Sequence, residues 1–354
     1  MCYAAASPRN DYASSLENYQ ADHVLLRMQI YDHHVERATR FQEQFRPEMH
    51  GATLFTTTLA LGCITAGCAQ NIILTNDDGW ATAQVRAQFS ALTSTGFDVI
   101  LSAPAVNMSG TGSTSATPTP LGEPCEFDTC PTGSPAEGFN ASDPRLNYVN
   151  AFPVDAARYG IQTLAPQFFG GPPELVVSGP NIGSNLGLAV FFSGTLGAAC
   201  EAAKEGIPSI AFSGTSGSQV SYTTLTSTPN ATSTLAAETY SALTATFVQA
   251  LTSSGISPLL PGGITLNVNY PSVDACPSPA DYQWVLSRVF LNILATDVET
   301  CGSTTLPLES NVVAAGCFAS VSVVDASTKM DANLTMQAAV LQRLANLPLS
   351  CLPS

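Results

Sequence analysis

The sequence predicts an α/β fold in which a mostly parallel sheet carries helices on both faces. Two observations predict it. Short apolar runs rich in Ile, Val and Leu alternate with segments of about 12 residues whose apolar positions recur at helical spacing. No internal repeat and no change in composition divides the chain after residue 70. This alternation is typical of βαβ units, which build a parallel sheet between layers of helices.

Five apolar runs are expected as strands. Each is bounded by Gly, Pro, Asn or Ser, residues that end regular structure. In chain order the expected strands are 71–75, 97–104, 173–179, 207–214 and 262–271. The later region 284–325 is also β-rich and extended in character.

The helices are expected between and after these strands. The first ends at Gly96, and another begins with Ser and Thr and ends at Gly206, both common helix boundaries. A third follows a polar start and places Tyr240, Leu243 and Phe247 at spacings of three and four. The expected helices are 81–96, 193–206, the apolar part of 223–255, and 336–347.

The first 69 residues differ from the remainder. Residues 49–69 combine an apolar stretch of about 15 residues with small residues near Ala69, the layout of a secretory signal cleaved before Gln70. Residues 1–48 are charged and polar, and we interpret them as a mis-called start or a dispensable extension. A signal-anchor protein with a cytosolic tail is the alternative, although the stretch is short for a membrane span. A lipoprotein signal is less favoured because Thr65 stands where an aliphatic residue is expected.

The charge balance excludes some partners. The net charge is −15, only 11% of residues are charged, and Lys and Arg do not cluster. Such a surface repels phosphate backbones and anionic lipids, so neither a nucleic-acid duplex nor a membrane is expected as a partner. A homodimer is included among the expected assemblies.

Residues after the expected cleavage contain no histidine, because His23, His33, His34 and His50 all precede it. Seven cysteines remain, and in an oxidising compartment they favour disulfides over zinc. Cys125 and Cys130 flank a turn-like segment and could close a small loop, whereas Cys200 lies in an Ala-rich helix as the odd thiol. The other four, whose pairing the sequence leaves open, are Cys276, Cys301, Cys317 and Cys351. Four N-glycosylation sequons also fit secretion, at Asn107, Asn140, Asn230 and Asn333.

Polar loops follow three of the expected strands. They are "NDDG" (76–79), "NMSGTG" (107–112) and "SGPNIGSNLG" (178–187). Because ligands bind at the carboxyl ends of parallel strands, we expect the side chains of Asp77, Asp78, Ser109 and Asn181 to converge. Two carboxylates, a hydroxyl and an amide oxygen form a set suited to Mg²⁺, Mn²⁺ or Ca²⁺.

Each motif has a simpler interpretation when it is taken alone. "NDDG" is a common turn, and the "SGT" at 193–195 is an ordinary helix N-cap. The order of the motifs, all at strand ends, favours a site. Without histidine, hydrolysis by a Ser-His-Asp triad or a His-ligated metal is excluded, which leaves metal-assisted water or a carboxylate. A helix that starts with "SGT" also offers hydroxyls and backbone N–H groups to a phosphate.

The chain resembles the SurE-type phosphatase/nucleotidase family (survival protein SurE). The motifs that carry the resemblance occur in the family's order: "ILTNDDG" (73–79), "NMSGTGS" (107–113), "LVVSGPNIGSNLG" (175–187), "FSGTLGAACEAAKEGIPSIAFS" (192–213) and "LNVNYP" (266–271). The resemblance implies a Rossmann-like three-layer α/β/α sandwich over 70–354, with a β-rich C-terminal extension. It also implies a divalent-metal phosphomonoesterase, an acid phosphatase or nucleotidase acting on small phosphate monoesters.

Site residues follow from the resemblance position by position. Asp77 and Asp78 match the family's metal-binding aspartates, and they are the expected catalytic residues. Ser109 and Asn181 match its metal-site serine and asparagine. The residues that match its phosphate pocket are Asn185, Ser193, Gly194 and Thr195.

Two departures bear on the substrate. The family's "NDDGxxAPG" is "NDDGWATAQ" in this chain, and a long Ser/Thr/Pro insertion with Cys125 and Cys130 follows Ser109. Both indicate altered access to the site. The alternative functions are a non-catalytic ligand-binding protein and a cell-wall-associated glycoprotein on the same fold.

Overall fold

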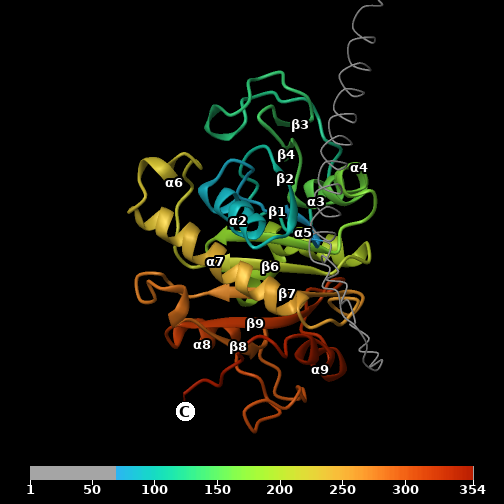
Figure 1. The fold of residues 1–354 in the computed structure, drawn as a ribbon. Helices are drawn as coiled ribbons and strands as arrows, with labels where there is room; N and C mark the ends of the chain where they lie inside the picture. The colour runs from blue at the N-terminus through green and yellow to red at the C-terminus, as the bar shows by residue number, and fades with distance from the viewer. Residues whose placement is uncertain (1–68, 354) are drawn as a thin grey trace, which may run out of the picture. The chain divides into compact units, whose positions relative to one another are not determined.

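A computed structural model describes residues 69–353, which form one nine-stranded sheet between two layers of helices (Figure 1). The strand order is β3-β4-β2-β1-β5-β6-β7-β9-β8, from the top of Figure 1 to its bottom. The interpretations of residues 1–48 and of the signal up to Cys68 fall outside the described residues.

The strands are β1 Asn71–Thr75, β2 Asp98–Pro104, β3 Glu137–Asn140, β4 Asp143–Val149, β5 Leu175–Ile182, β6 Ser209–Gly214, β7 Ile264–Tyr270, β8 Gln283–Ser287 and β9 Phe318–Asp325. The helices are α2 Ala83–Ser94, α3 Pro153–Tyr159, α4 Ala165–Phe169, α5 Gly194–Lys204, α6 Thr224–Ser227, α7 Thr232–Thr252, α8 Glu309–Ala314 and α9 Leu334–Arg343. Two short turns of helix matter for the site, η1 Glu126–Asp128 and η3 Gly187–Phe191.

The centre of the sheet is parallel. Strands β4, β2, β1, β5, β6 and β7 all run in one direction. Only β3 and β9 pair antiparallel, with β4 and β7 respectively. The predicted α/β class with a mostly parallel sheet is therefore confirmed. The carboxyl ends of β2, β1 and β5 lie side by side, so the loops that follow these strands meet at one edge.

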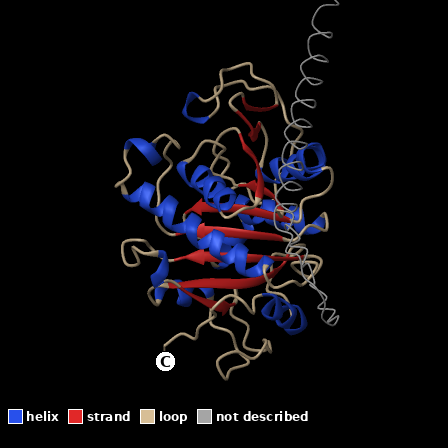
Figure 2. Ribbon diagram, viewed as in Figure 1, coloured by secondary structure: helices blue, strands red, loops and turns tan. Residues whose placement is uncertain are grey.

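Successive side chains of each strand point to opposite faces of the sheet, so the hydrophobic core has a part on each face. Ile72 and Leu74 of β1 pack in the cluster that includes residues of α2 and α7, whereas Ile73 packs on the opposite side with Ile161 and Ala202. Figure 2 shows α2 and α7 crossing one face, and the long loops lie at the two ends of the sheet. None of the described helices combines the length and the apolar character needed to cross a bilayer.

The sequence left the segment 126–172 unassigned, and the structure adds β3, β4, α3 and α4 there. The two strands are hard to see in the sequence, because β3 ("EGFN") is a short polar edge strand and β4 ("DPRLNYV") begins with polar residues and a proline before its buried half. The region 284–325 contains two strands, but a long loop and α8 separate them. The closing helix begins at Leu334, two residues before the expected 336, and ends at Arg343.

Disulfides close the loops at both ends of the sheet. The expected Cys125–Cys130 bridge is present, and Cys200 is a buried free thiol. The remaining four cysteines pair as Cys276–Cys317 and Cys301–Cys351. Only the fold decides this pairing, since the sequence allowed other combinations.

Helix α5 packs directly against the loop that follows β2. A Cβ added to Gly197 would overlap the carbonyl oxygen of Gly112. Gly→Ala within a helix normally stabilises by about 1 kcal/mol. Here we expect Gly197→Ala to destabilise the protein by about 1–3 kcal/mol, the usual cost of overpacking.

The measurement is chemical unfolding of purified protein. Gly122→Ala is the matched control, because a Cβ at Gly122 meets no atom within 4 Å. It should change stability by less than about 0.5 kcal/mol. A stabilised Gly197→Ala variant would show that α5 and this loop are not in contact.

Candidate active site

The turn after β1 buries two adjacent carboxylates. Asp77 and Asp78 are each 2% exposed. The side chain of Asn76 closes the turn by donating to the carbonyl of Gly79 (2.9 Å) and accepting from its N–H (3.3 Å). Gly79 has φ +113°, a backbone conformation that glycine adopts without strain. The interpretation of "NDDG" as a turn is therefore correct for the local geometry. The same turn directs both carboxylates into the protein.

Asp77 faces the start of α5. Its Oδ1 accepts a hydrogen bond from Thr195 Oγ1 (2.6 Å). A Cβ at Gly194 would lie 2.8 Å from Asp77 Cβ and 3.0 Å from its Oδ2, so glycine is needed for this approach. Ser193 caps the same helix, since its side chain accepts from Leu196 N–H (3.0 Å). The capping interpretation thus holds for Ser193, whereas Thr195 contacts a carboxylate.

Asp78 faces the end of β5. Its Oδ2 accepts from the backbone N–H of Ile182 (2.9 Å), and its carbonyl accepts from Gln219 Nε2 (2.8 Å). The adjacent Asn181 is 8% exposed, and its Nδ2 donates to the carbonyl of Gly183 (2.6 Å). Among the described residues, no hydrogen bond engages the amide oxygen of Asn181.

Ser109 lies on the third loop. Met108 N–H donates to the carbonyl of Asp77 (2.7 Å), which brings Ser109 within one residue of the aspartate turn. Its hydroxyl is exposed, and its backbone N–H is held by Asn107 Oδ1 (2.8 Å). The structure thus brings the loops of Asp77, Asp78, Ser109 and Asn181 together at one edge of the sheet.

Burial raises the pKa of both aspartates. For Asp77 the hydrogen bond from Thr195 opposes the effect. For Asp78 the neighbouring charge of Asp77 raises the pKa further, well above its ordinary value. Among residues 69–353, neither carboxylate makes an ion pair. Two buried carboxylates with oxygen neighbours and no cationic side chain fit a divalent cation, which would keep both ionised.

Asn185 is held in a polar network beneath the loop. Its Nδ2 donates to Ser213 Oγ (2.8 Å), and its backbone N–H donates to Asn269 Oδ1 (2.8 Å). Its carbonyl accepts from Asn267 Nδ2 (2.9 Å). The side chain of Asn185 is therefore directed at the sheet in this structure, whereas Gly194 and Thr195 lie against Asp77 and Ser193 caps α5.

Sequence reasoning missed Glu309, which anchors this network. Its carboxylate is fully buried and accepts from Gly187 N–H (2.8 Å), Asn267 Nδ2 (3.0 Å) and Ser322 Oγ (3.0 Å). Burial raises the pKa of Glu309 to about 7. No local pattern pointed to this residue, because its partners come from distant strands and loops.

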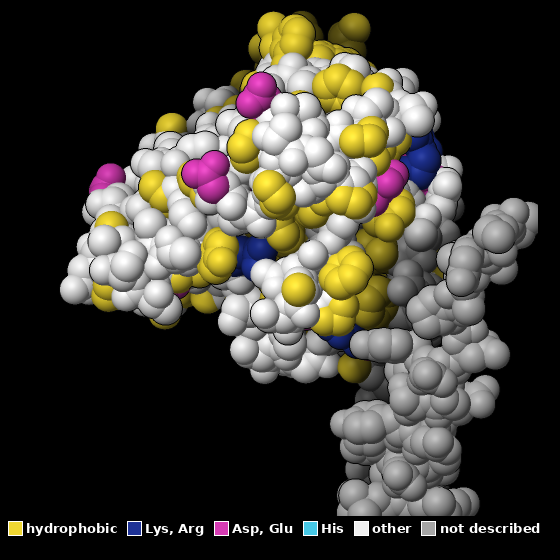
Figure 3. Space-filling view, turned by 90° about the horizontal axis from the view of Figure 1, so that it is seen from above, with side chains coloured by type: hydrophobic (Ala, Val, Ile, Leu, Met, Phe, Trp, Pro, Cys, Tyr) yellow, Lys and Arg dark blue, Asp and Glu magenta, His cyan; other side chains and the backbone are white. Residues whose placement is uncertain are grey.

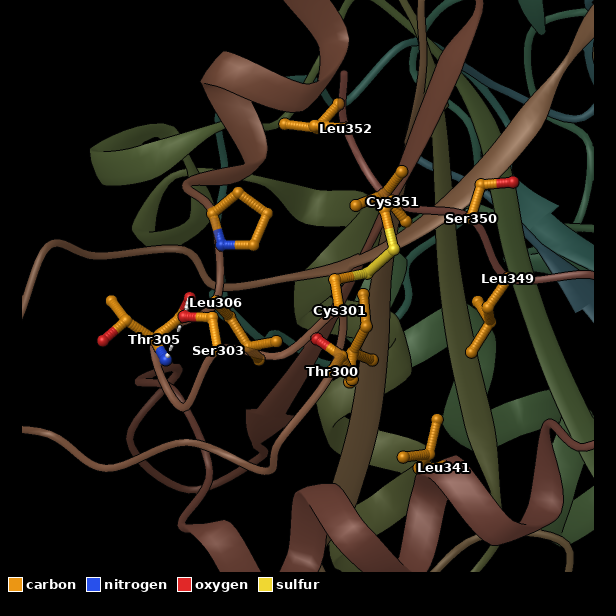
Figure 4. A pocket seen from close by; sticks show the side chains of 13 residues that line it. Thr300, Cys301, Ser303, Thr305, Leu306, Leu341, Leu349, Ser350, Cys351 and Leu352 are labelled. Atoms are coloured by element: carbon orange, nitrogen blue, oxygen red, sulfur yellow. Dashed lines mark hydrogen bonds between the residues drawn. A yellow bond between two sulfur atoms is a disulfide. The ribbon is translucent and has the colours of Figure 1, made fainter. Parts of the chain in front are cut away.

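An apolar cavity lies away from these residues. A cavity of about 570 Å³ is lined by aliphatic side chains such as Leu306, Leu341 and Leu349 and bordered by the Cys301–Cys351 disulfide (Figure 4). None of the eight expected site residues lines it.

Glu309 makes stability depend on pH. Its pKa is raised from 4.5 to about 7 on folding, so its contribution is complete below about pH 4.5 and is lost as pH rises through about 7. At about 1.4 kcal/mol per pKa unit, the loss is at most about 3.5 kcal/mol. We expect Glu309→Gln, which stays neutral, to reduce the fall in Tm between pH 5 and pH 8.

Thermal unfolding without added metal at both pH values provides the measurement. Glu126, whose pKa burial also raises to about 7, contributes in the same direction in both proteins. The exposed Glu299→Gln is the matched control and should retain the wild-type dependence. If the Tm of Glu309→Gln fell between pH 5 and pH 8 as much as that of the wild type, the pH dependence would not come from Glu309.

Comparisons with known proteins find relatives that match most of the chain. The family model described as survival protein SurE matches residues 72–288. An acid phosphatase of Yarrowia lipolytica is 31% identical over 302 residues, which cover 77% of this chain and 84% of that protein.

Two proteins named 5′-nucleotidase SurE match over shorter segments. That of Lawsonia intracellularis is 36% identical over 143 residues (40% of this chain, 50% of its own length). That of Methanopyrus kandleri is 38% identical over 142 residues (40% and 48%). This chain thus spans about half the length of these relatives. The crystal structure of the SurE protein from Aquifex aeolicus aligns with a TM-score of 0.49 at 22% identity, covering 72% of this chain and 93% of that one.

Proposed function

The chain belongs to the survival protein SurE family, and we propose that it is a secreted, divalent-metal-dependent phosphomonoesterase. Its relatives are named acid phosphatase and 5′-nucleotidase, so hydrolysis of a phosphate monoester is the shared chemistry. The observation that carries the metal dependence is the burial of Asp77 and Asp78 side by side without a cationic partner among residues 69–353.

The proposed ligands of the metal are Asp77, Asp78, Ser109 and Asn181. When bound, the metal would neutralise phosphate charge and lower the pKa of water. Thr195 holds Asp77 through its hydroxyl, and Ile182 N–H holds Asp78, so both carboxylates keep a fixed orientation. One of the two is the proposed proton acceptor or nucleophile, and the sequence and geometry support either role.

The first turn of α5 is the proposed phosphate site. Gly194 lets this turn approach Asp77 closely, and the positive end of the helix favours an anion. The small-molecule partner is a nucleotide or another phosphate monoester. On the face shown in Figure 3, dark blue Lys and Arg side chains stand apart from one another, which supports a small substrate over a nucleic-acid duplex.

Secretion is supported by the three disulfides and by the exposure of Asn107, Asn230 and Asn333 in their sequons. A non-catalytic binding protein or a cell-wall glycoprotein on this fold is the competing proposal. Neither accounts for the buried pair of aspartates.

Loss of one aspartate charge should abolish turnover and leave the fold intact. We expect wild-type protein to hydrolyse p-nitrophenyl phosphate in an EDTA-sensitive manner. Asp78→Asn should lower kcat by at least about a hundredfold, the size typical of removing one key electrostatic group. Its Tm without metal should not fall, because the variant no longer buries a charge.

Asp281→Asn, at an exposed position, is the control and should keep the wild-type rate. Added Mn²⁺ or Mg²⁺ should raise the Tm of wild-type protein more than that of Asp78→Asn. A wild-type protein with no EDTA-sensitive hydrolysis would favour the binding or structural alternatives.

The mature protein should begin at Gln70. Cleavage after Ala69 removes residues 1–69 and every histidine. Intact-mass and peptide mass spectrometry of the secreted protein identify its first residue. Both methods also detect an N-terminal glutamine that has cyclised. A mature chain that retains His33 or His34 would contradict both the cleavage site and the exclusion of histidine chemistry.

A further inference from the structure

A short hairpin of the insertion, residues 125–130, is closed by a disulfide and packs on the aspartate turn. Cys125 N–H donates to the carbonyl of Cys130 (2.9 Å), and the Cys125–Cys130 bridge closes the loop. The hairpin is attached to the turn by a hydrogen bond from Trp80 Nε1 to Thr129 Oγ1 (3.1 Å). It is attached to the end of β2 by Glu126 N–H, which donates to the carbonyl of Ala105 (3.0 Å). The hairpin therefore bridges the first and second loops of the site.

The carboxylate of Glu126 reaches the turn itself. Its Oε1 accepts from the backbone N–H of Ala81 (2.6 Å). A Cβ added to Gly79 would overlap the same carboxylate. Glu126 thus lies against the residue that follows Asp78 and binds the first N–H groups ahead of α2.

A cation completes the arrangement from the other side. Arg86 Nε donates to the carbonyl of Trp80 (2.7 Å), and its guanidinium lies 5.1 Å from the Trp80 ring and 4.8 Å from the Tyr222 ring. Glu126 holds the N–H side of the segment 79–81, and Arg86 holds its carbonyl side. Because the segment is continuous with Asp77 and Asp78, a change in its backbone would move both carboxylates.

We propose that Glu126 is a positioning residue for phosphate hydrolysis, which fixes the turn carrying Asp77 and Asp78 by accepting the N–H of Ala81. The inference rests on the proposed phosphomonoesterase function. Glu126 is assigned a role through the turn because its carboxylate accepts from the backbone N–H of Ala81 and is not hydrogen-bonded to Asp77 or Asp78. The hairpin belongs to the insertion, so this support is a property of the insertion rather than of the motif itself.

The test compares Glu126→Ala with Glu126→Gln in the full mature protein. Alanine removes the acceptor, and displacement of the carboxylates should lower kcat for p-nitrophenyl phosphate about tenfold to a hundredfold. KM should change by less than about threefold, because the phosphate site at α5 is separate from the hairpin. Glutamine keeps an oxygen that can accept from Ala81 N–H, so it should restore kcat to within about threefold of wild type.

Two further variants sharpen the result. Glu123→Ala removes an exposed carboxylate from the same segment and should leave kcat unchanged. Cys125→Ser/Cys130→Ser opens the hairpin and should lower kcat in the same direction as Glu126→Ala. Circular dichroism at the assay temperature, and a Tm above that temperature, confirm that each variant is folded.

The outcomes separate the two hypotheses. An active wild type with an equally active Glu126→Ala variant overturns only the role of Glu126. Equal losses in the Ala and Gln variants also overturn it, because the negative charge and not the acceptor would then be required. A wild type without EDTA-sensitive activity overturns both the proposed function and the inference.

Discussion

Burial of two neighbouring carboxylates at the end of β1 is the constraint on which the site depends. Each is 2% exposed, and each raises the cost of ionising the other. Hydrogen bonds offset part of this cost, because Thr195 donates to Asp77 and the N–H of Ile182 donates to Asp78. These donors orient the carboxylates, but they do not neutralise them. The remaining charge is what makes a divalent cation the fitting occupant of the site.

Some other buried carboxylates in the described part of the chain have a cationic partner, whereas Glu309 is held by neutral donors. Arg288 lies 2.8 Å from Asp297 and 3.5 Å from Asp331, and all three side chains are at most 8% exposed. That cluster joins the end of β8 to the segment after β9 and serves the fold. Breaking such a pair would leave an uncompensated buried charge, so the arginine stabilises these two carboxylates. Asp77 and Asp78 have no such arginine among residues 69–353, which agrees with the cation proposed for them.

Local sequence was sufficient for much of the fold and for the centre of the site. Apolar runs ending in polar loops located β1, β2, β5, β6 and β7, and parallel pairing then placed those loops at one edge. The convergence of Asp77, Asp78 and Asn181 could be predicted because each lies within three residues of a strand end. Cysteine spacing predicted the short Cys125–Cys130 bridge for the same reason, since both partners flank one turn.

Contacts between distant segments could not be read in this way. The sequence by itself determined the α/β class, the motif loops and the inventory of cysteines. The tertiary structure decided that β3 and β4 extend the sheet, that Cys301 pairs with Cys351, and that Glu126 and Glu309 support the site. Glu126 is 45 residues from the N–H that it accepts, and Glu309 is 122 residues from Gly187. Hydrophobic periodicity reports only which side of its own element a residue occupies, whereas these partners are set by how the crossovers and the long loops are placed around the sheet.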